Sequence, residues 1–145
     1  LGPLGVENRT SISNLKMNEW QKEGLIEYLG ETDNVSSYIE RATCIVLPSY
    51  REGMSRALLE SAAMGRPLIA TNVPGCREII DDRITGFLCK PRDSIDLSEK
   101  IEQMIKLPHE VRSLMGTKGR EKVENGFGQD IVSNLYAEAI RNCKI

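Results

Sequence analysis

The stretch that decides the fold runs from residue 43 to residue 71 and reads TCIVLPSYREGMSRALLESAAMGRPLIAT. It opens with a short β-branched apolar run closed by Pro48, which is too short for a helix and is typical of a central parallel strand buried on both faces. The alanine-rich residues 55–64 predict a helix that Gly65 ends, and residues 67–71 predict a second strand. A strand, a helix and another strand form a βαβ unit, which indicates a parallel sheet.

The same alternation continues along the rest of the chain. Residues 1–5 resemble the end of a strand, and further strands are predicted at residues 25–30 and 85–90. Helical patterns cover residues 15–24, a short segment from Asn34 or Ser36 to Arg41, a turn at 76–80, and residues 97–105, 110–124 and 130–143. We therefore predict an α/β fold with a Rossmann-like, mostly parallel sheet that carries helices on both faces.

Composition limits the classes of protein to which the chain can belong. With 145 residues, of which 40% are apolar and 28% charged, it fits one domain, residues 1–145, or a piece of a longer protein. A net charge of −2 gives no reason to expect a nucleic-acid partner. The four cysteines lack the spacing of a zinc site, which favours free thiols in a reducing, cytoplasmic compartment. No apolar stretch is long enough to span a bilayer, and the start on Leu1 predicts a fragment.

The loop after the first predicted strand is the candidate ligand site, because ligands of parallel sheets bind beyond the carboxyl ends of the strands. The helix that starts near Ser55 presents free backbone N–H groups, which we expect from Gly53, Met54, Ser55 and Arg56. These groups carry about half a positive charge together and suit a phosphate. Gly53 lets the backbone approach the ligand without a Cβ in the way.

Two glutamates flank this helix start. Side chains on a helix lean toward its N-terminus, so Glu60 leans back from a point about 7 Å along the axis from Ser55. A carboxylate there can accept hydrogen bonds from two neighbouring ribose hydroxyls. Glu52 lies on the loop and points to the other side of the diphosphate, where a transferred sugar would lie. Two glutamates eight positions apart occur by chance in most proteins, but the surrounding strand, proline and glycine pattern favours a nucleotide-sugar site.

Residues 44–92 resemble the carboxyl-terminal domain of the retaining glycosyltransferases of family 4. The pattern of that family is a strand, P-S, E-G, a second Glu eight positions later, A-x-G-x-P, a strand ending in A-T, then G-x-x-E-I and G-x-L-x-x-P. This chain reads LPSYREGMSRALLESAAMGRPLIATNVPGCREIIDDRITGFLCKPRD, and a looser similarity extends to both ends. It looks most like the branch that adds hexoses in bacterial capsule and surface-polysaccharide synthesis.

The resemblance implies the carboxyl-terminal, donor-binding half of a GT-B fold. It also implies an enzyme that transfers a hexose from a UDP-sugar to a lipid-linked or polysaccharide acceptor, the hexose being galactose or an N-acetylhexosamine. The resemblance implies that no metal or other cofactor takes part. By position, Glu60 matches the ribose ligand and Glu52 the catalytic-site glutamate that contacts sugar hydroxyls. Gly53, Met54 and Ser55 match the loop on sugar and diphosphate, and Gly30 matches the turn against the base. A basic pair that binds the diphosphate and the acceptor-binding domain are both expected upstream of Leu1, so the fragment alone is expected to be inactive.

The sequence also departs from the family pattern. Met54 stands where the family often has Phe, which changes the lining of the sugar pocket. Arg83 and Thr85 replace a common Gly and Asn, and we expect these two changes to alter only a surface turn.

Several alternatives stay open at this point. The chain is also compatible with half of a non-hydrolysing UDP-sugar epimerase, which the lone His109 disfavours, or with a nucleotide-binding regulatory module. Asp81 and Asp82 are expected in a solvent-facing turn rather than on a metal, and His109 at a helix start. Arg51 and Arg56 either add charge at the phosphate loop or are solvated. The full-length enzyme is expected in the cytoplasm, peripheral to the inner face of the plasma membrane.

Overall fold

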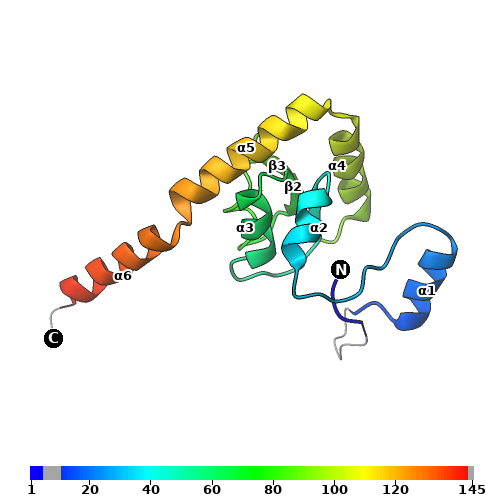
Figure 1. Cartoon of the computed structure of the whole chain (residues 1–145), viewed down its shortest axis with the longest axis horizontal. Helices are drawn as coiled ribbons and strands as arrows, with labels where there is room; N and C mark the ends of the chain where they lie inside the picture. The colour runs from blue at the N-terminus through cyan, green and yellow to red at the C-terminus, as the bar shows by residue number, and fades with distance from the viewer. Residues whose placement is uncertain (5–10, 144–145) are drawn as a thin grey trace. The chain divides into compact units, whose positions relative to one another are not determined.

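A computed structural model describes the chain except for residues 5–10 and 144–145. The chain divides into two compact units, Leu1–Val35 and Ser36–Ile145 (Figure 1). The amino-terminal unit contains helix α1 (Asn14–Lys22). Ser13 caps this helix, and its hydroxyl accepts a hydrogen bond from the Lys16 N–H at 3.2 Å. The predicted helix at residues 15–24 is therefore confirmed.

The strand predicted at residues 25–30 is wrong, because this segment is irregular. Gly2 N–H donates to the Gly30 carbonyl at 2.8 Å, and the Tyr28 hydroxyl donates to the Gly2 carbonyl at 2.7 Å. One backbone hydrogen bond is too few to make a strand pair. Residues 1–4 form no strand either, and residue 5 lies outside the described residues.

The second unit holds the sheet and the remaining helices, except that the first residue of α2, Val35, belongs to the first unit. Its elements are α2 (Val35–Arg41), β1 (Ile45–Leu47), α3 (Arg56–Ala63), β2 (Leu68–Thr71), β3 (Gly86–Cys89), α4 (Ser94–Lys106), α5 (His109–Gly126) and α6 (Gln129–Asn142). The three strands are parallel and lie in the order β1-β2-β3. The predicted α/β fold with a parallel sheet is confirmed.

Helices cover both faces of the sheet. Leu68 and Ala70 of β2 point to one face, where they pack with Leu58 and Ala62 of α3. Ile69 points to the other face, where the buried cluster contains side chains of β3, α4 and α5: Phe87, Met104 and Met115. Figure 1 shows α3 and α4 on opposite sides of the strands. This alternation along β2 explains why all four of its residues are buried.

The prediction that residues 43–49 form the central strand is wrong in one respect. β1 is an outer strand of the described sheet, paired only with β2, and Val46 is 36% exposed. A continuous apolar run shows that a strand is apolar on both sides, but it carries no information on how many strands lie beside it. The central strand is β2.

The ends of α3 follow the predicted signals. Ser55 is the N-cap, and its hydroxyl accepts a hydrogen bond from the Leu58 N–H at 3.4 Å. Gly65 has a φ of 69°, the left-handed conformation in which helices commonly end. The Arg66 N–H donates to the Ser61 carbonyl at 3.0 Å, which closes the turn into β2.

The turn at residues 81–86 is more than a surface feature, contrary to the prediction. Thr85 is 2% exposed, and its hydroxyl accepts a hydrogen bond from the Asp81 N–H at 2.9 Å. Arg83 has a φ of 65°, which strains a residue with a side chain. The buried Thr85 side chain therefore stabilises the turn through its hydrogen bond to the Asp81 N–H. Arg83 occupies a backbone conformation that suits glycine.

Helix α6 confirms the predicted helix at residues 130–143, but its apolar side chains are not buried. The exposed fractions are 43% for Val132, 61% for Leu135, 69% for Tyr136 and 71% for Ile140. In the described part of the chain, no helix is long and apolar enough to cross a membrane.

Candidate functional site

The three parallel strands end at one edge of the sheet, and the loop that follows each strand lies there. The loop after β1 leads into α3, the loop after β2 contains residues 72–80, and the loop after β3 leads into α4. The predicted site residues 52–60 are all on the first loop and on α3. The second loop contacts the start of α3, where the Gly75 carbonyl accepts a hydrogen bond from the Ser55 N–H.

Within the part of the chain that the structure describes, the start of α3 leaves three backbone N–H groups free rather than the predicted four. Ser55 N–H donates to the Gly75 carbonyl at 3.3 Å, so this group is already used. The N–H groups of Gly53, Met54 and Arg56 have no hydrogen-bond acceptor among the described residues. Ser55 is buried, whereas Gly53 and Met54 are exposed. The exposed loop can therefore present its amides to an anion while Ser55 anchors it.

Glu52 is held in place before any ligand binds. Its carboxylate is half-buried and accepts a hydrogen bond from the Ser49 hydroxyl, with 2.6 Å between Oγ and Oε1. This bond uses one carboxylate oxygen and leaves Oε2 to accept from a ligand. Ser49 belongs to the P-S part of the family pattern, but no role was predicted for it.

Glu60 lies one turn from Arg56 on α3. The Arg56 guanidinium and the Glu60 carboxylate approach to 3.6 Å, and the Glu60 side chain is 50% exposed. The Arg56 side chain is 90% exposed, so the pair is weak and solvent-screened. Glu60 can therefore exchange this partner for ligand hydroxyls at little cost. Arg51 is exposed as well.

Gly75 is a site residue that sequence reasoning missed. Its φ is 84°, and a Cβ at this position would lie 1.8 Å from the Gly53 carbonyl oxygen and 2.9 Å from that of Glu52. Its N–H donates to the Glu78 carboxylate at 2.7 Å. The loop after β2 therefore fits against the Glu52–Gly53 backbone only because residue 75 has no side chain. The sequence feature that could have indicated this role is the glycine after a proline in the P-G-C-R-E segment at residues 74–78.

The thiol next to this loop is chemically inert. Cys76 is fully buried. Burial, together with the nearby carboxylates of Glu52 and Glu78, raises the pKa of Cys76 to about 11. The thiol is therefore protonated at neutral pH, which excludes it as a nucleophile.

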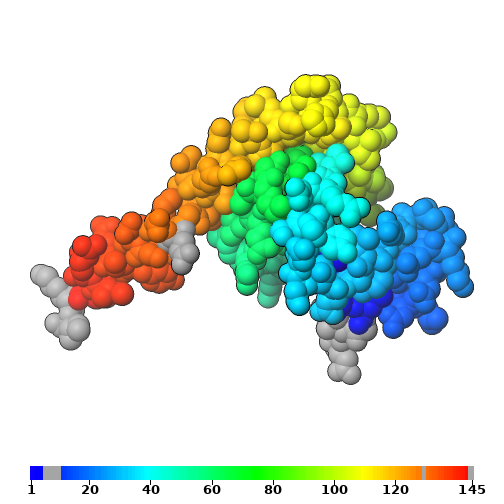
Figure 2. All heavy atoms as spheres, viewed as in Figure 1, coloured from blue at the N-terminus to red at the C-terminus, as the bar shows by residue number. Residues whose placement is uncertain are grey.

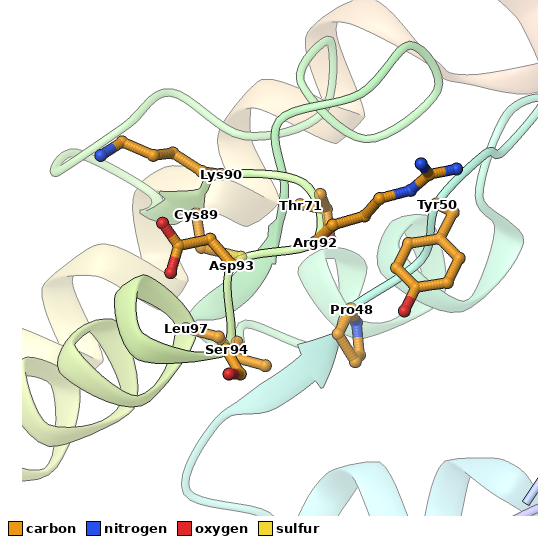
Figure 3. Close-up of a pocket in the computed structure, with 9 residues that line it drawn as sticks. All are labelled: Pro48, Tyr50, Thr71, Cys89, Lys90, Arg92, Asp93, Ser94 and Leu97. Carbon is orange, nitrogen blue, oxygen red and sulfur yellow. The ribbon is translucent and has the colours of Figure 1, made fainter.

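A cavity of about 370 Å³ opens at the same edge of the sheet. It lies between the ends of the strands and the start of α4, and Figure 3 shows Lys90, Arg92 and Tyr50 among its lining residues. The Arg92 guanidinium lies 5.5 Å from the centre of the Tyr50 ring. None of the predicted site residues lines this cavity. The lining combines the cations of Lys90 and Arg92 with the carboxylate of Asp93, a set of charges that suits a hydroxylated group.

The remaining predicted residues have these positions. Gly30 belongs to the amino-terminal unit, where its φ is 72° and its carbonyl accepts the Gly2 N–H, so its contact with a base stays a prediction. Asp81 pairs with Lys122 at 2.7 Å, and the Asp82 carboxylate accepts the Leu88 N–H at 2.9 Å. Among the described residues, no group of three or more His, Cys, Asp or Glu side chains is arranged to hold a metal ion. His109 is exposed at the start of α5.

Comparison with known proteins gives a family match. Residues 12–122 match the model of the family described as glycosyl transferases group 1. The chain is 32% identical over 133 residues to the capsular polysaccharide biosynthesis glycosyltransferase CapM of Staphylococcus aureus, covering 91% of this chain and 34% of the relative. It is also 32% identical over 128 residues to the N,N'-diacetylbacillosaminyl-diphospho-undecaprenol alpha-1,3-N-acetylgalactosaminyltransferase of Campylobacter jejuni, covering 86% of this chain and 34% of the relative.

Solved structures agree on the fold. The structure of Anabaena Alr3699/HepE in complex with UDP and glucose matches with a TM-score of 0.77 and 18% identity, covering 88% of this chain and 35% of that one. At this identity the likeness shows the fold alone, which is that of the GT-B glycosyltransferases. The chain spans about a third of the length of the curated relatives that it matches.

Proposed function

The chain belongs to the group 1 glycosyl transferases, and from this membership we propose that it forms the donor-binding part of a retaining glycosyltransferase. The donor is a UDP-sugar, either UDP-galactose or a UDP-N-acetylhexosamine, and the acceptor is a lipid-linked saccharide or a growing polysaccharide. Two names support this choice: one relative is an N-acetylgalactosaminyltransferase that acts on a diphospho-undecaprenol compound, and one structural neighbour holds UDP and glucose. Free thiols at all four cysteines favour a cytoplasmic enzyme.

The observation that carries the proposal is the start of α3. Three amides there have no acceptor among the described residues, and the glutamates at positions 52 and 60 flank them. A diphosphate on these amides would have a carboxylate on either side. Each carboxylate would repel the phosphates but can accept hydrogen bonds from sugar hydroxyls. This order of groups is that of a nucleotide sugar: ribose on Glu60, diphosphate on the helix end, hexose on Glu52.

Sugar transfer requires the site to stabilise negative charge on the leaving group. During transfer the bond between the anomeric carbon and the diphosphate oxygen breaks, and negative charge accumulates on the departing diphosphate. Fixed N–H groups at a helix end stabilise that charge without having to reorient. Glu52, held by Ser49, orients the hexose hydroxyls so that the anomeric carbon faces the acceptor. We propose that no metal is needed, because the helix end and cationic side chains neutralise the leaving group.

Titration of the ¹⁵N-labelled chain with a panel of nucleotide sugars tests the proposal. UDP, UDP-galactose, UDP-N-acetylgalactosamine and UDP-glucose are each expected to shift the amide signals of Gly53, Met54 and Arg56, and at matched concentration GDP-mannose is expected to shift them less. Chemical shifts detect even millimolar binding. Absence of shifts at these three amides with every nucleotide, or shifts confined to other parts of the chain, would remove the α3 start from the donor site.

A further inference from the structure

A second cavity lies at the amino-terminal ends of β1 and β2, the edge of the sheet away from the predicted donor site. Its volume is about 190 Å³, and it is bordered by the end of α2, by the turn from α3 into β2 and by the start of α5. Figure 2 shows these three segments, cyan, green and yellow, meeting at the surface. The cavity holds several water volumes, and a phosphoryl group is small enough to fit.

The ionisable side chains that line this cavity are all basic. They are Arg41, Arg66, Arg112 and His109, and no Asp or Glu lines it. In the described part of the chain, none of the three arginines has a carboxylate within ion-pair distance, so no ion pair neutralises their charge. Like charges held around one small cavity repel one another, so the arrangement favours an anion between them.

Arg66 provides an independent sign that a partner is missing. Its Nε is buried and has no hydrogen-bond acceptor among the described residues. Buried donors are nearly always paired in folded proteins, because an unpaired one loses its hydrogen bonds to water without compensation. Arg66 lines the cavity, so an oxygen atom bound there can supply the acceptor.

Arg112 and the start of α5 complete the site. The Arg112 Nη1 donates to the carbonyls of Leu107 and Ile105, the latter at 3.2 Å, which fixes the guanidinium against the end of α4. Its Nε and Nη2 have no acceptor among the described residues and are therefore available as donors. Helix α5 has 18 residues, and its N-cap Pro108 makes no side-chain cap. The N–H groups of His109 and Glu110 have no acceptor among the described residues, so the helix end adds partial positive charge.

We propose that this cavity binds a phosphoryl group, carried either by a phosphorylated small molecule or by a lipid headgroup. Guanidinium groups bind phosphate oxygens in pairs, and a dianion balances several arginines better than a monoanion does. The site is separate from the α3 start, so it holds whether or not the chain binds a nucleotide sugar.

The test is a titration of the full ¹⁵N-labelled chain with inorganic phosphate and with pyrophosphate at constant ionic strength, with acetate as the comparison anion. Phosphate is expected to give saturable shifts at the amides of His109, Arg112 and Ser113, and acetate much smaller ones. Arg41→Gln and Arg66→Gln are each expected to weaken phosphate binding about tenfold, since each removes a charge-assisted hydrogen bond. Arg120→Gln is the matched control, because Arg120 lies exposed on the same helix α5, pairs with Glu124 and does not line the cavity.

A second arm separates the two sources of the phosphoryl group. Flotation with phosphatidylcholine vesicles that contain phosphatidic acid, compared with pure phosphatidylcholine vesicles, reports on a lipid headgroup; loss of vesicle binding in Arg41→Gln but not in Arg120→Gln assigns it to this cavity. If Arg66→Gln does not fold, Arg41→Gln alone decides, because that side chain is exposed. Non-saturable shifts that are equal for phosphate and acetate, or unchanged affinity in Arg41→Gln, would overturn the proposal.

Discussion

At the scale of single residues, Glu60 is the sharpest test of the donor site, because its present partner is weak. An exposed ion pair such as Glu60–Arg56 contributes at most about 1 kcal/mol to stability. Glu60→Gln is therefore expected to leave the melting temperature within about 2 °C of the original. Affinity for UDP is expected to fall about tenfold, because hydrogen bonds to a charged acceptor are the stronger ones. Calorimetry or NMR titration measures the fall; Glu99→Gln on α4, also exposed, is the control. Unchanged UDP affinity would remove Glu60 from the site.

Glu52 is expected to affect the sugar and not the nucleotide. Glu52→Gln should weaken binding of a UDP-hexose more than that of UDP, since only the former has hydroxyl groups on that side of the diphosphate. The Ser49 hydroxyl can still donate to the amide oxygen of Gln, so the loop keeps its hydrogen bond. The ratio of the two dissociation constants, measured in parallel titrations, is the readout. If both ligands lose affinity equally, Glu52 acts on the shape of the loop.

Sequence reasoning reached the residues whose positions are set locally. Glu52, Gly53 and Glu60 are close together because one loop and one helix carry them, and spacing along a helix is known in advance. Gly75 was missed because its contact with Gly53 joins the loops after two different strands. The use of the Ser55 N–H by Gly75 was missed for the same reason.

The arginines of the second cavity show the same limit over longer distances. They come from α2, from the turn before β2 and from α5, and no spacing along the sequence links them. Only the folded sheet brings them to one edge.

At the scale of secondary-structure elements, predictions held where local signals agreed. Helix α3 had a cap, an alanine-rich interior and a terminal glycine, and its bounds follow these signals closely. The strand predicted at residues 25–30 failed because an apolar run becomes a strand only when a neighbour supplies a ladder of hydrogen bonds. In the described residues that segment has one such bond, from Gly2 to Gly30. Tertiary pairing decides strands more than it decides helices.

The contact between the loops after β1 and β2 depends on Gly75. Gly75→Ala places a methyl group where the Gly53 carbonyl lies, 1.8 Å away, and puts a side chain at a φ of 84°. The loops must separate, so we expect the free energy of unfolding to fall by about 1–3 kcal/mol or more. The affinity for UDP-hexoses is expected to fall as well, because Glu52 and Gly53 shift together.

Urea denaturation and nucleotide titration of the same preparation measure both effects. Gly126→Ala is the matched control, because that glycine ends helix α5 with no atom within 4 Å of the added Cβ. Alanine is expected to be neutral or slightly stabilising there. Full stability in Gly75→Ala would contradict the tight fit.

The turn before β3 is expected to become more stable when its strained residue is replaced. Arg83 has a φ of 65°, and its exposed side chain makes only a 3.8 Å contact with Asp82. A left-handed residue with a side chain costs about 1–2 kcal/mol, part of which the greater freedom of an unfolded glycine offsets. Arg83→Gly is therefore expected to raise the free energy of unfolding by about 0.5–1 kcal/mol, measured with urea. Arg120→Gly within α5 should lower it by about 1 kcal/mol. Equal losses in both variants would contradict the strain.

At the scale of the whole molecule, the parallel sheet separates two chemistries. The carboxyl ends of the strands carry the α3 start and the glutamates, whereas the amino ends of β1 and β2 carry the arginine-lined cavity. Both edges have a helix N-terminus: α3 begins at the carboxyl edge because it follows strand β1, whereas α5 begins at the amino edge because it follows helix α4, which runs back along the sheet. An anion at one edge therefore need not compete with a ligand at the other.

The chain alone is expected to bind UDP weakly and to transfer nothing. A nucleoside diphosphate carries about two to three negative charges at neutral pH, whereas one helix end offsets only about half a charge. The cations nearest to the α3 start are exposed, and Arg56 is already shared with Glu60. From the family resemblance we expect that a basic pair and an acceptor domain complete the site in the full-length protein, and the chain spans about a third of the relatives that it matches.

Two missing charge-assisted contacts cost about 3–6 kcal/mol, or two to four decades of affinity. An enzyme that binds its donor at about 10–100 μM would leave this chain in the millimolar range or weaker. Transfer also needs an acceptor held against the anomeric carbon. Calorimetry with UDP and a radiolabelled transfer assay with UDP-hexoses measure the two halves. Low-micromolar binding would show that the chain completes its own phosphate clamp, and Arg51→Gln would then test whether Arg51 supplies it. Acceptor-dependent turnover by the chain alone would mean that these 145 residues already hold both substrates.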